Sequence, residues 1–231
     1  MGVFRTIFVP IHKAGVPFIL IFATCTIGLF WFIENWGFLG VVVTIWCAYF
    51  FRDPSRVTPV REGLIVSPAD GVIQLIDNAP PPNELKIGGN PRPRICIFMN
   101  VFNVHINRVP IDGIVKAINH RPGKFLNASL DKASEENERL SVHLKTEKDV
   151  DVVFVQIAGL IARRIICWIN IGDNLKTGER FGMIRFGSRV DIYLPEHILP
   201  MVCEGQTVIA GESVLADLSS AEKISRAGKT R

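Results

Sequence analysis

Three residue types that can together perform nucleophilic chemistry occur in separate short stretches of this chain. Ser188 follows Gly187 in "RFGSRVDIYLP", a stretch in which apolar and polar residues alternate from the serine onward. His105 stands in "NVFNVHINRVP", and Asp70 stands in "SPADGVI". A serine hydroxyl attacks a carbonyl efficiently only when a base takes its proton, and a histidine oriented by a carboxylate is such a base. These residue types therefore permit a Ser–His–Asp set, but their presence alone does not establish one.

Each of these residues also has an ordinary structural explanation. Asp-Gly is a common turn dipeptide, so Asp70 can be a turn residue, and a histidine inside a strand can be a packed core residue. Ser188 lacks the Gly-x-Ser-x-Gly frame of the α/β-hydrolases. Gly187 needs no side-chain room and tolerates backbone angles that other residues avoid. A membrane serine hydrolase using Ser188, His105 and Asp70 is therefore one alternative at this point.

The elements that would carry these residues are predominantly strands. Runs such as "LIVSPADGVIQLI", "RICIFMNVFNVHI" and "DVVFVQIAG" are short and rich in β-branched residues, and turn signals separate them. The main exception is "LDKASEENERL", which is polar and suits a helix or an exposed loop. We expect a mainly β catalytic domain of the barrel-sandwich or β-sandwich type. Near the end, "EGQTVIAGESVLADL" is similar to the hairpins of biotinyl and lipoyl carriers, although it has no lysine. A membrane-anchored scaffold of that type is a second alternative.

The N-terminal part has a different character. Residues 15–33 carry no charge, and a second apolar run covers residues 37–51. The first run is long enough to cross a hydrocarbon core, and the second is marginal. Because basic residues flank both ends, the positive-inside rule places both ends in the cytoplasm, as in a helical hairpin or a re-entrant wedge. We therefore expect an anchor in the cell membrane, with the catalytic domain on the cytoplasmic side. The flanking residues are Arg5, Lys13, Arg52 and Arg56.

The cysteines and the net charge narrow the possible cofactors and binding partners of the protein. The five cysteines are scattered without a Cys-x-x-Cys pair, which favours reduced, packed thiols over a disulfide framework or a metal site. The net charge is +4, and no aromatic-basic pattern for nucleic acid is visible. An anionic membrane surface is the better partner for a chain with an anchor.

Taken together, these stretches resemble the phosphatidylserine decarboxylase proenzymes, in the short form with a Phe-Gly-Ser cleavage motif. The resemblance covers nearly the whole chain. It departs from the longer branch of the family, which has Leu-Gly-Ser-Thr at the cleavage site. It also lacks that branch's paired histidines, Asp-Tyr-His-Arg-x-His, because Phe102 takes the earlier position and only His105 remains. The stretches that carry the resemblance are "YFFRDPSR", "SPADG", "NVHINRVPIDG", "PGKFLNASLDKASEENER", "QIAGLIARRI" and "GERFGMIRFGSRVD".

The resemblance implies that the chain cuts itself between Gly187 and Ser188. Ser188 would attack the Gly187 carbonyl and then become a covalent pyruvoyl group, with His105 as the base and Asp70 orienting it. The anchor at 1–51 and the catalytic region at 52–187 would then form the β chain. Residues 188–231 would form the α chain, which carries the pyruvoyl group, and the two chains would remain together as a heterodimer.

In turnover, the resemblance implies that the pyruvoyl group forms a Schiff base with phosphatidylserine and acts as an electron sink. Carbon dioxide is lost, His105 is the candidate donor of the returning proton, and phosphatidylethanolamine is released. Arg108, Arg163 and Arg164 are candidates for binding the phosphodiester, because guanidinium pairs well with phosphate. Lys124, Asn137 and Glu138 fall in a family motif but receive no role. The remaining histidines are expected at the surface or in packing, namely His12, His120, His143 and His197.

Overall fold

A computed structural model describes residues 9–126, 136–159, 164–185, 187–222, 224 and 226–229. The chain divides into two compact units. One comprises residues 1–55 together with Phe102–Val104, and the other comprises residues 56–101 and 105–231. Most of the polar stretch "LDKASEENERL", for which the sequence allows a helix or a loop, lies outside the described residues.

The first unit is a pair of antiparallel helices. Both helices follow from runs of apolar residues with few helix breakers, and the single proline lies at the start of α2, where no backbone donor is lost. The helices approach closely at Gly40, where an added Cβ would lie 2.7 Å from Thr26 Oγ1. Next to this contact, the hydroxyls of Thr26 and Thr44 lie 3.1 Å apart. The helical elements are the 3-10 turn Lys13–Gly15, α2 (Val16–Phe32), the 3-10 turn Glu34–Trp36 and α3 (Gly37–Phe50).

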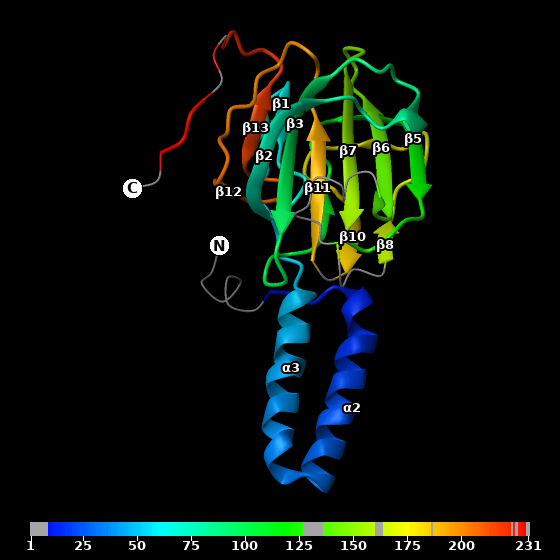
Figure 1. Ribbon diagram of the computed structural model, residues 1–231, viewed down its shortest axis with the longest axis vertical. Helices are drawn as coiled ribbons and strands as arrows, with labels where there is room; N and C mark the ends of the chain where they lie inside the picture. Colours follow the sequence, from blue (N-terminus) through cyan, green and yellow to red (C-terminus); the bar gives the residue numbers. More distant parts are fainter. Residues whose placement is uncertain are drawn as a thin grey trace. The chain divides into compact units, whose positions relative to one another are not determined.

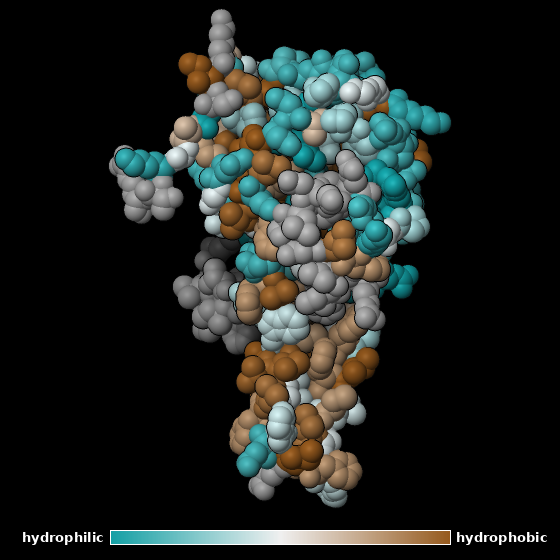
Figure 2. All heavy atoms as spheres, in the orientation of Figure 1, coloured by the Kyte–Doolittle hydropathy of each residue, from teal (hydrophilic) through white to brown (hydrophobic). Residues whose placement is uncertain are grey.

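The outer surface of this hairpin is apolar. Large side chains such as Trp31 and Phe32 are each 83% exposed, and apolar residues cover much of the hairpin on the face that Figure 2 shows. The continuous stretch Lys13–Phe32 has 20 residues and meets the length and composition of a membrane-crossing helix, which needs about 30 Å. With 14 residues, α3 is shorter than such a span. The exposed apolar surface suits lipid better than water.

The second unit consists of antiparallel sheets (Figure 1). An eight-stranded sheet has the order β12-β2-β3-β11-β7-β6-β5-β9, a three-stranded sheet has the order β4-β10-β8, and β1 pairs with β13. The strands of the large sheet are β2 (Gly71–Ala79), β3 (Arg92–Met99), β5 (Gly113–Arg121), β6 (Arg139–Lys145), β7 (Asp151–Ala158), β9 (Asn174–Leu175), β11 (Ser188–Tyr193) and β12 (Thr207–Val208). The others are β1 (Leu64–Val66), β4 (Ile106–Arg108), β8 (Arg164–Cys167), β10 (Arg180–Arg185) and β13 (Val214–Asp217).

The core of this unit lies between the large sheet and the smaller ones. Phe154 of β7 packs against Phe181 of β10, with ring centroids 4.7 Å apart, so the two sheets share one apolar interior. Val190 and Ile192 of β11 belong to this interior. The predicted class, mainly β with an N-terminal hydrophobic helical hairpin, is confirmed.

Strand β11 is held on both edges and on its outer face. It pairs with β3 on one edge and with β7 on the other (Figure 1). On the face opposite the core, Arg189 makes a two-pronged ion pair with Asp191, at 2.7 and 2.9 Å. Arg94 lies 3.7 Å from Asp191 and holds Asp77 at 2.9 and 2.6 Å. These contacts hold β11 from its first residue onward, and none of them involves the chain that directly precedes it.

Candidate active site

Gly187 and Ser188 lie where the chain passes from the small sheet to the large one. Strand β10 ends at Arg185, and β11 begins at Ser188, whose side chain is fully buried. Gly187 has φ of +66°, a left-handed conformation that glycine adopts without strain. An added Cβ would lie 3.9 Å from Val101 Cγ1, so the backbone angle is the reason for glycine and a lack of space is not.

His105 is brought to this bond by the start of β4. The imidazole is 1% exposed, and its Nε2 accepts a hydrogen bond from the Gly187 backbone N–H at 3.3 Å. A ring nitrogen that accepts a hydrogen bond carries no proton, so Nε2 is the basic nitrogen in this arrangement. The structure therefore brings His105 into contact with Gly187, which lies 82 positions later in the sequence and directly precedes Ser188.

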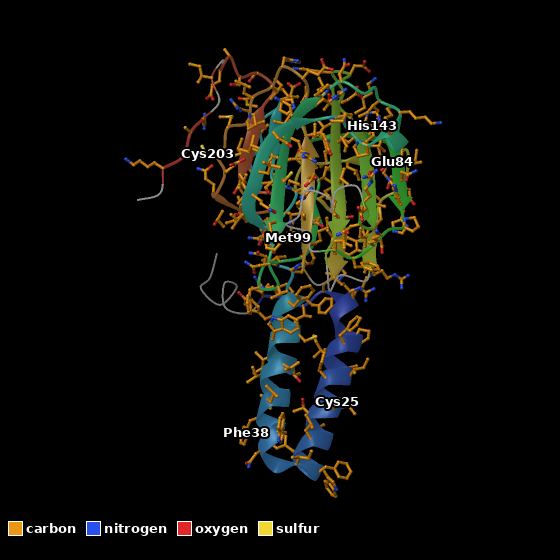
Figure 3. The ribbon with its side chains drawn as sticks, viewed as in Figure 1. Cys25, Phe38, Glu84, Met99, His143 and Cys203 are labelled. Atoms are coloured by element: carbon orange, nitrogen blue, oxygen red, sulfur yellow. The ribbon has the colours of Figure 1, made fainter. Side chains whose placement is uncertain are left out.

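The Ser188 hydroxyl has a weak partner. Its Oγ donates to the sulfur of Met99 at 3.4 Å, and Met99 is the cross-strand neighbour of Ser188. Met99, which Figure 3 labels, is the last residue of β3. A thioether sulfur is a poor hydrogen-bond acceptor, so little energy opposes rotation of the hydroxyl toward a carbonyl.

Asp70 occupies the turn between β1 and β2, as the Asp-Gly dipeptide predicts. Its Oδ2 lies 2.6 Å from Arg56 Nη2, and its Oδ1 accepts from the Ala210 backbone N–H at 2.8 Å. Asp70 thus joins the turn, the linker after the anchor and the C-terminal hairpin. The orientation of His105 by Asp70 stays a prediction.

Of the arginines predicted to bind the head group, two lie among the described residues. Arg108 is buried and donates from Nη1 to the Gly178 carbonyl at 2.7 Å. Arg164 is exposed on β8, and its cross-strand partner is Arg185 at the end of β10. Arg163 lies outside the described residues.

The comparisons with known proteins bear on the same residues. The profile of the family described as phosphatidylserine decarboxylase matches residues 43–216, which include each of the site residues above. This chain belongs to the phosphatidylserine decarboxylase family. It is therefore an enzyme of the carboxy-lyase class.

Curated relatives of similar length support the assignment. The chain is 57% identical over 213 residues to a phosphatidylserine decarboxylase proenzyme of Cereibacter sphaeroides, covering 92% of each chain. It is 57% identical to the proenzyme of Ruegeria pomeroyi, covering 90% of this chain and 95% of that one. The proenzyme of Paramagnetospirillum magneticum is 54% identical, with 92% of this chain and 89% of the other covered.

Asn137, which lies in a family motif, links Leu126 to the end of β7. Asn137 is fully buried, and its Nδ2 donates to the carbonyls of Leu126, at 2.8 Å, and Ala158, at 2.7 Å. Its Oδ1 accepts from the Leu126 N–H at 2.9 Å. Ala158 is also the cross-strand neighbour of Ser188 on β7. Lys124 and Glu138 pair with Glu136 and His120, and neither acquires a catalytic role from these contacts.

The remaining candidates for ligand binding lie away from Ser188. Within the described ranges, no group of three or more histidine, cysteine or acidic side chains could hold a metal ion. The five cysteines are free thiols. A cavity of about 700 Å³ is lined by residues of the linker and of the loops around Ile111 and Lys176, and it includes none of the predicted site residues.

Sequence reasoning missed Arg185 and Met99. Burial and the charge of Arg164 lower the pKa of the Arg185 guanidinium, as expected for two like charges on adjacent strands. Arg185 stands three positions before Ser188, inside a family stretch, so its closeness in sequence to the predicted cleavage bond is a signal that could have identified it. Met99 has no local signal, because it ends an apolar run and reaches Ser188 only through the pairing of β3 with β11.

Proposed function

We propose that this chain is a self-processing decarboxylase that converts phosphatidylserine to phosphatidylethanolamine and carbon dioxide through a pyruvoyl group made from Ser188. Membership of the decarboxylase family supports the overall reaction. The observation that carries the site is the contact of the buried His105 ring with Gly187, directly before a buried serine on a fixed strand.

Self-cleavage would begin at the Gly187–Ser188 bond. His105 Nε2 takes the proton of the Ser188 hydroxyl as that oxygen attacks the Gly187 carbonyl carbon, and an ester replaces the amide. Elimination then separates residues 1–187 from residues 188–231 and leaves a dehydroalanine at 188. This residue would tautomerise and take up water with loss of ammonia to become the pyruvoyl group. Because β11 is paired on both edges, the new terminus at residue 188 stays in the site after the break.

The residues around Ser188 fit the prosthetic group. The pyruvoyl group supplies a ketone for the substrate amine and an electron sink for the carbanion formed when carbon dioxide leaves. Met99 offers a soft, apolar neighbour at the side chain of residue 188, and burial of the site restricts water. His105 holds a proton-accepting nitrogen beside the same residue and is our candidate for returning a proton to the product.

Arg164 and Arg185 are proposed to bind the phosphodiester of the substrate. Their register on β8 and β10 puts two guanidinium groups side by side, and an anion between them would relieve their repulsion. Arg108 is less suited to this task, because its Nη1 is bound to the Gly178 carbonyl inside the protein.

Replacing Arg164 and Arg185 together by methionine should raise KM for phosphatidylserine about tenfold or more, which is the scale of one charged hydrogen bond to a ligand. The value of kcat should change little, because the reacting atoms are untouched. Initial rates in mixed micelles with varied phosphatidylserine content measure both constants. Arg180→Met, on the exposed start of β10, is the matched control. An unchanged KM in the double variant would remove the arginine pair from the substrate site.

The hairpin of α2 and α3 is proposed to hold the enzyme at the cell membrane, where the substrate resides. Its exposed apolar surface and the 20-residue stretch Lys13–Phe32 support insertion. Basic residues at both ends of the hairpin favour a catalytic unit on the cytoplasmic side.

The decisive experiment is the mass of the protein purified from the membrane fraction and then denatured. We expect two chains, residues 1–187 and 188–231, with the smaller one blocked to Edman degradation and reactive toward carbonyl reagents. A single intact chain with an unmodified serine would refute self-cleavage and favour a serine hydrolase. Recovery in the soluble fraction would refute the anchor.

A further inference from the structure

Two buried amide side chains, one of which shares the sulfur of Met99 with Ser188, are not used by the reaction described above. Gln156 of β7 donates from Nε2 to Asn107 Oδ1 of β4 at 2.7 Å, and this bond links the large sheet to the small one. Both residues are fully buried in an otherwise apolar interior. Buried amides are costly unless they are bonded, so a pair of them in a core calls for a reason.

The Gln156 bond fixes the direction of the Asn107 amide. Because Asn107 Oδ1 accepts from Gln156, the Asn107 Nδ2 group points the other way and donates to Met99 Sδ at 3.6 Å. Gly182 leaves space for the Ile166 carbonyl and for the glutamine, since a Cβ there would lie 2.5 Å from Ile166 O and 3.1 Å from Gln156 Nε2. Gln156 Oε1 is buried and has no hydrogen-bond partner among the described residues. Gln156 therefore orients the Asn107 amide, although its own Oε1 accepts no hydrogen bond from the described residues.

Asn107 and Ser188 donate to the same sulfur atom. Ser188 Oγ lies 3.4 Å from Met99 Sδ, and the Asn107 amide donates a hydrogen bond to the same atom. A thioether accepts weakly, and an unbranched methionine side chain moves easily. The Asn107 amide would leave the sulfur for a better acceptor, and a negatively charged oxygen formed at the position of Ser188 Oγ would be such an acceptor.

We propose that Asn107 Nδ2 donates a hydrogen bond to Ser188 Oγ as this oxygen leaves during self-cleavage, with Gln156 as its positioning residue. The proposal rests on the function proposed above. In the ester, Oγ is bonded to the Gly187 carbonyl carbon. A base removes the proton from Ser188 Cα, a double bond forms between Cα and Cβ, and the Cβ–Oγ bond breaks. Its electron pair goes to Oγ, which remains on Gly187 as a carboxylate oxygen and accepts the hydrogen bond.

Asn107→Asp is the first test, because it keeps the size of the side chain and an acceptor for Gln156 but removes the donor. We expect cleavage to slow about 100-fold, the loss typical of one donor to a developing oxyanion. The ester should accumulate, and hydroxylamine should split the protein at Gly187–Ser188 and leave an unmodified serine at the new terminus. Denaturing mass spectrometry with and without hydroxylamine measures this. If the aspartate variant does not fold, Asn107→Leu, which is apolar and of similar volume, replaces it. We expect the same slow cleavage and accumulation of the ester.

Gln156→Leu tests the positioning role. It should slow cleavage about tenfold, because the Asn107 amide is then no longer held in its orientation by the hydrogen bond from Gln156. Its effect should vanish in the Asn107→Asp background, because the donor to be positioned is already lost. Ser141→Ala is the matched control, since Ser141 is equally buried on neighbouring β6 but bonds to Glu84 at 3.0 Å. The control should cleave normally. Thermal unfolding of each variant, measured in the uncleavable Ser188→Ala background, monitors the fold.

Each outcome bears on the proposal. Cleavage of Asn107→Asp at the wild-type rate would overturn it. An uncleaved variant that resists hydroxylamine would also overturn it, because the block would then precede the ester. Failure of the proposed function looks different, since the wild-type protein itself would remain a single chain.

Discussion

Replacing Ser188 with alanine should leave the protein as a single chain and abolish decarboxylation. In the proposed self-cleavage, the hydroxyl oxygen is both the attacking atom and the atom that leaves, so no other group can take its place. The fold should persist, because the substitution removes one weak hydrogen bond to Met99 while β11 keeps its pairing on both edges. Denaturing mass spectrometry and carbon dioxide release from phosphatidylserine vesicles measure the two effects.

A serine elsewhere in the same fragment provides the control. Ser219 Oγ bonds to Asp217 at 2.7 Å, away from the cleavage site, and Ser219→Ala should yield two chains and full activity. Two chains from Ser188→Ala would show that the break occurs at another bond or by an external protease. Activity in an uncleaved Ser188→Ala protein would exclude a cofactor made from this residue.

The strand that begins at Ser188 could be predicted from alternation alone, and the structure confirms it as β11. The same alternation suggests one buried and one solvent-facing side, yet Arg189 and Asp191 are buried as well. Their burial depends on the ion pair between them and on the approach of Arg94 of β3 to Asp191, and a cross-strand contact of that kind is absent from local sequence. The apolar hairpin was easier to predict, because length and lack of charge decide it without any distant partner.

The candidate site also contains residues that the sequence identifies and residues that only the structure brings together. Gly187, Ser188 and His105 lie in stretches long enough to be matched to a family, and the structure brings them together. Gln156 and Asn107 meet only because β7 and β4 belong to facing sheets, so nothing local marks them as a pair. Burial and the charge of Arg164 lower the pKa of Arg185, and Arg164 is its neighbour only through a strand register that the sequence does not encode locally. Residues whose role depends on distant neighbours therefore needed the structure.

His105→Ala should slow self-cleavage about 100-fold or more, because the Ser188 hydroxyl then has no base. A second variant separates this chemistry from simple packing. In His105→Gln, the amide oxygen can still accept the Gly187 N–H that Nε2 accepts at 3.3 Å, but it cannot take a proton at neutral pH. Time courses of cleavage, followed by denaturing mass spectrometry, should therefore be equally slow for both variants. Recovery of cleavage in His105→Gln would assign the histidine to holding Gly187 and remove it as the base.

Asp70 needs a comparison of its own, because its carboxylate also binds Arg56 at 2.6 Å. If Asp70 orients His105, Asp70→Ala should slow cleavage strongly, whereas Arg56→Met, which removes only the ion pair, should slow it much less. If Asp70 acts only as a crosslink between the turn and the linker, the two variants should be impaired alike. Efficient cleavage in both Asp70→Ala and His105→Ala would exclude His105 as the base and Asp70 as the residue that orients it. Self-cleavage would then depend on the backbone geometry at Gly187 and on another proton acceptor.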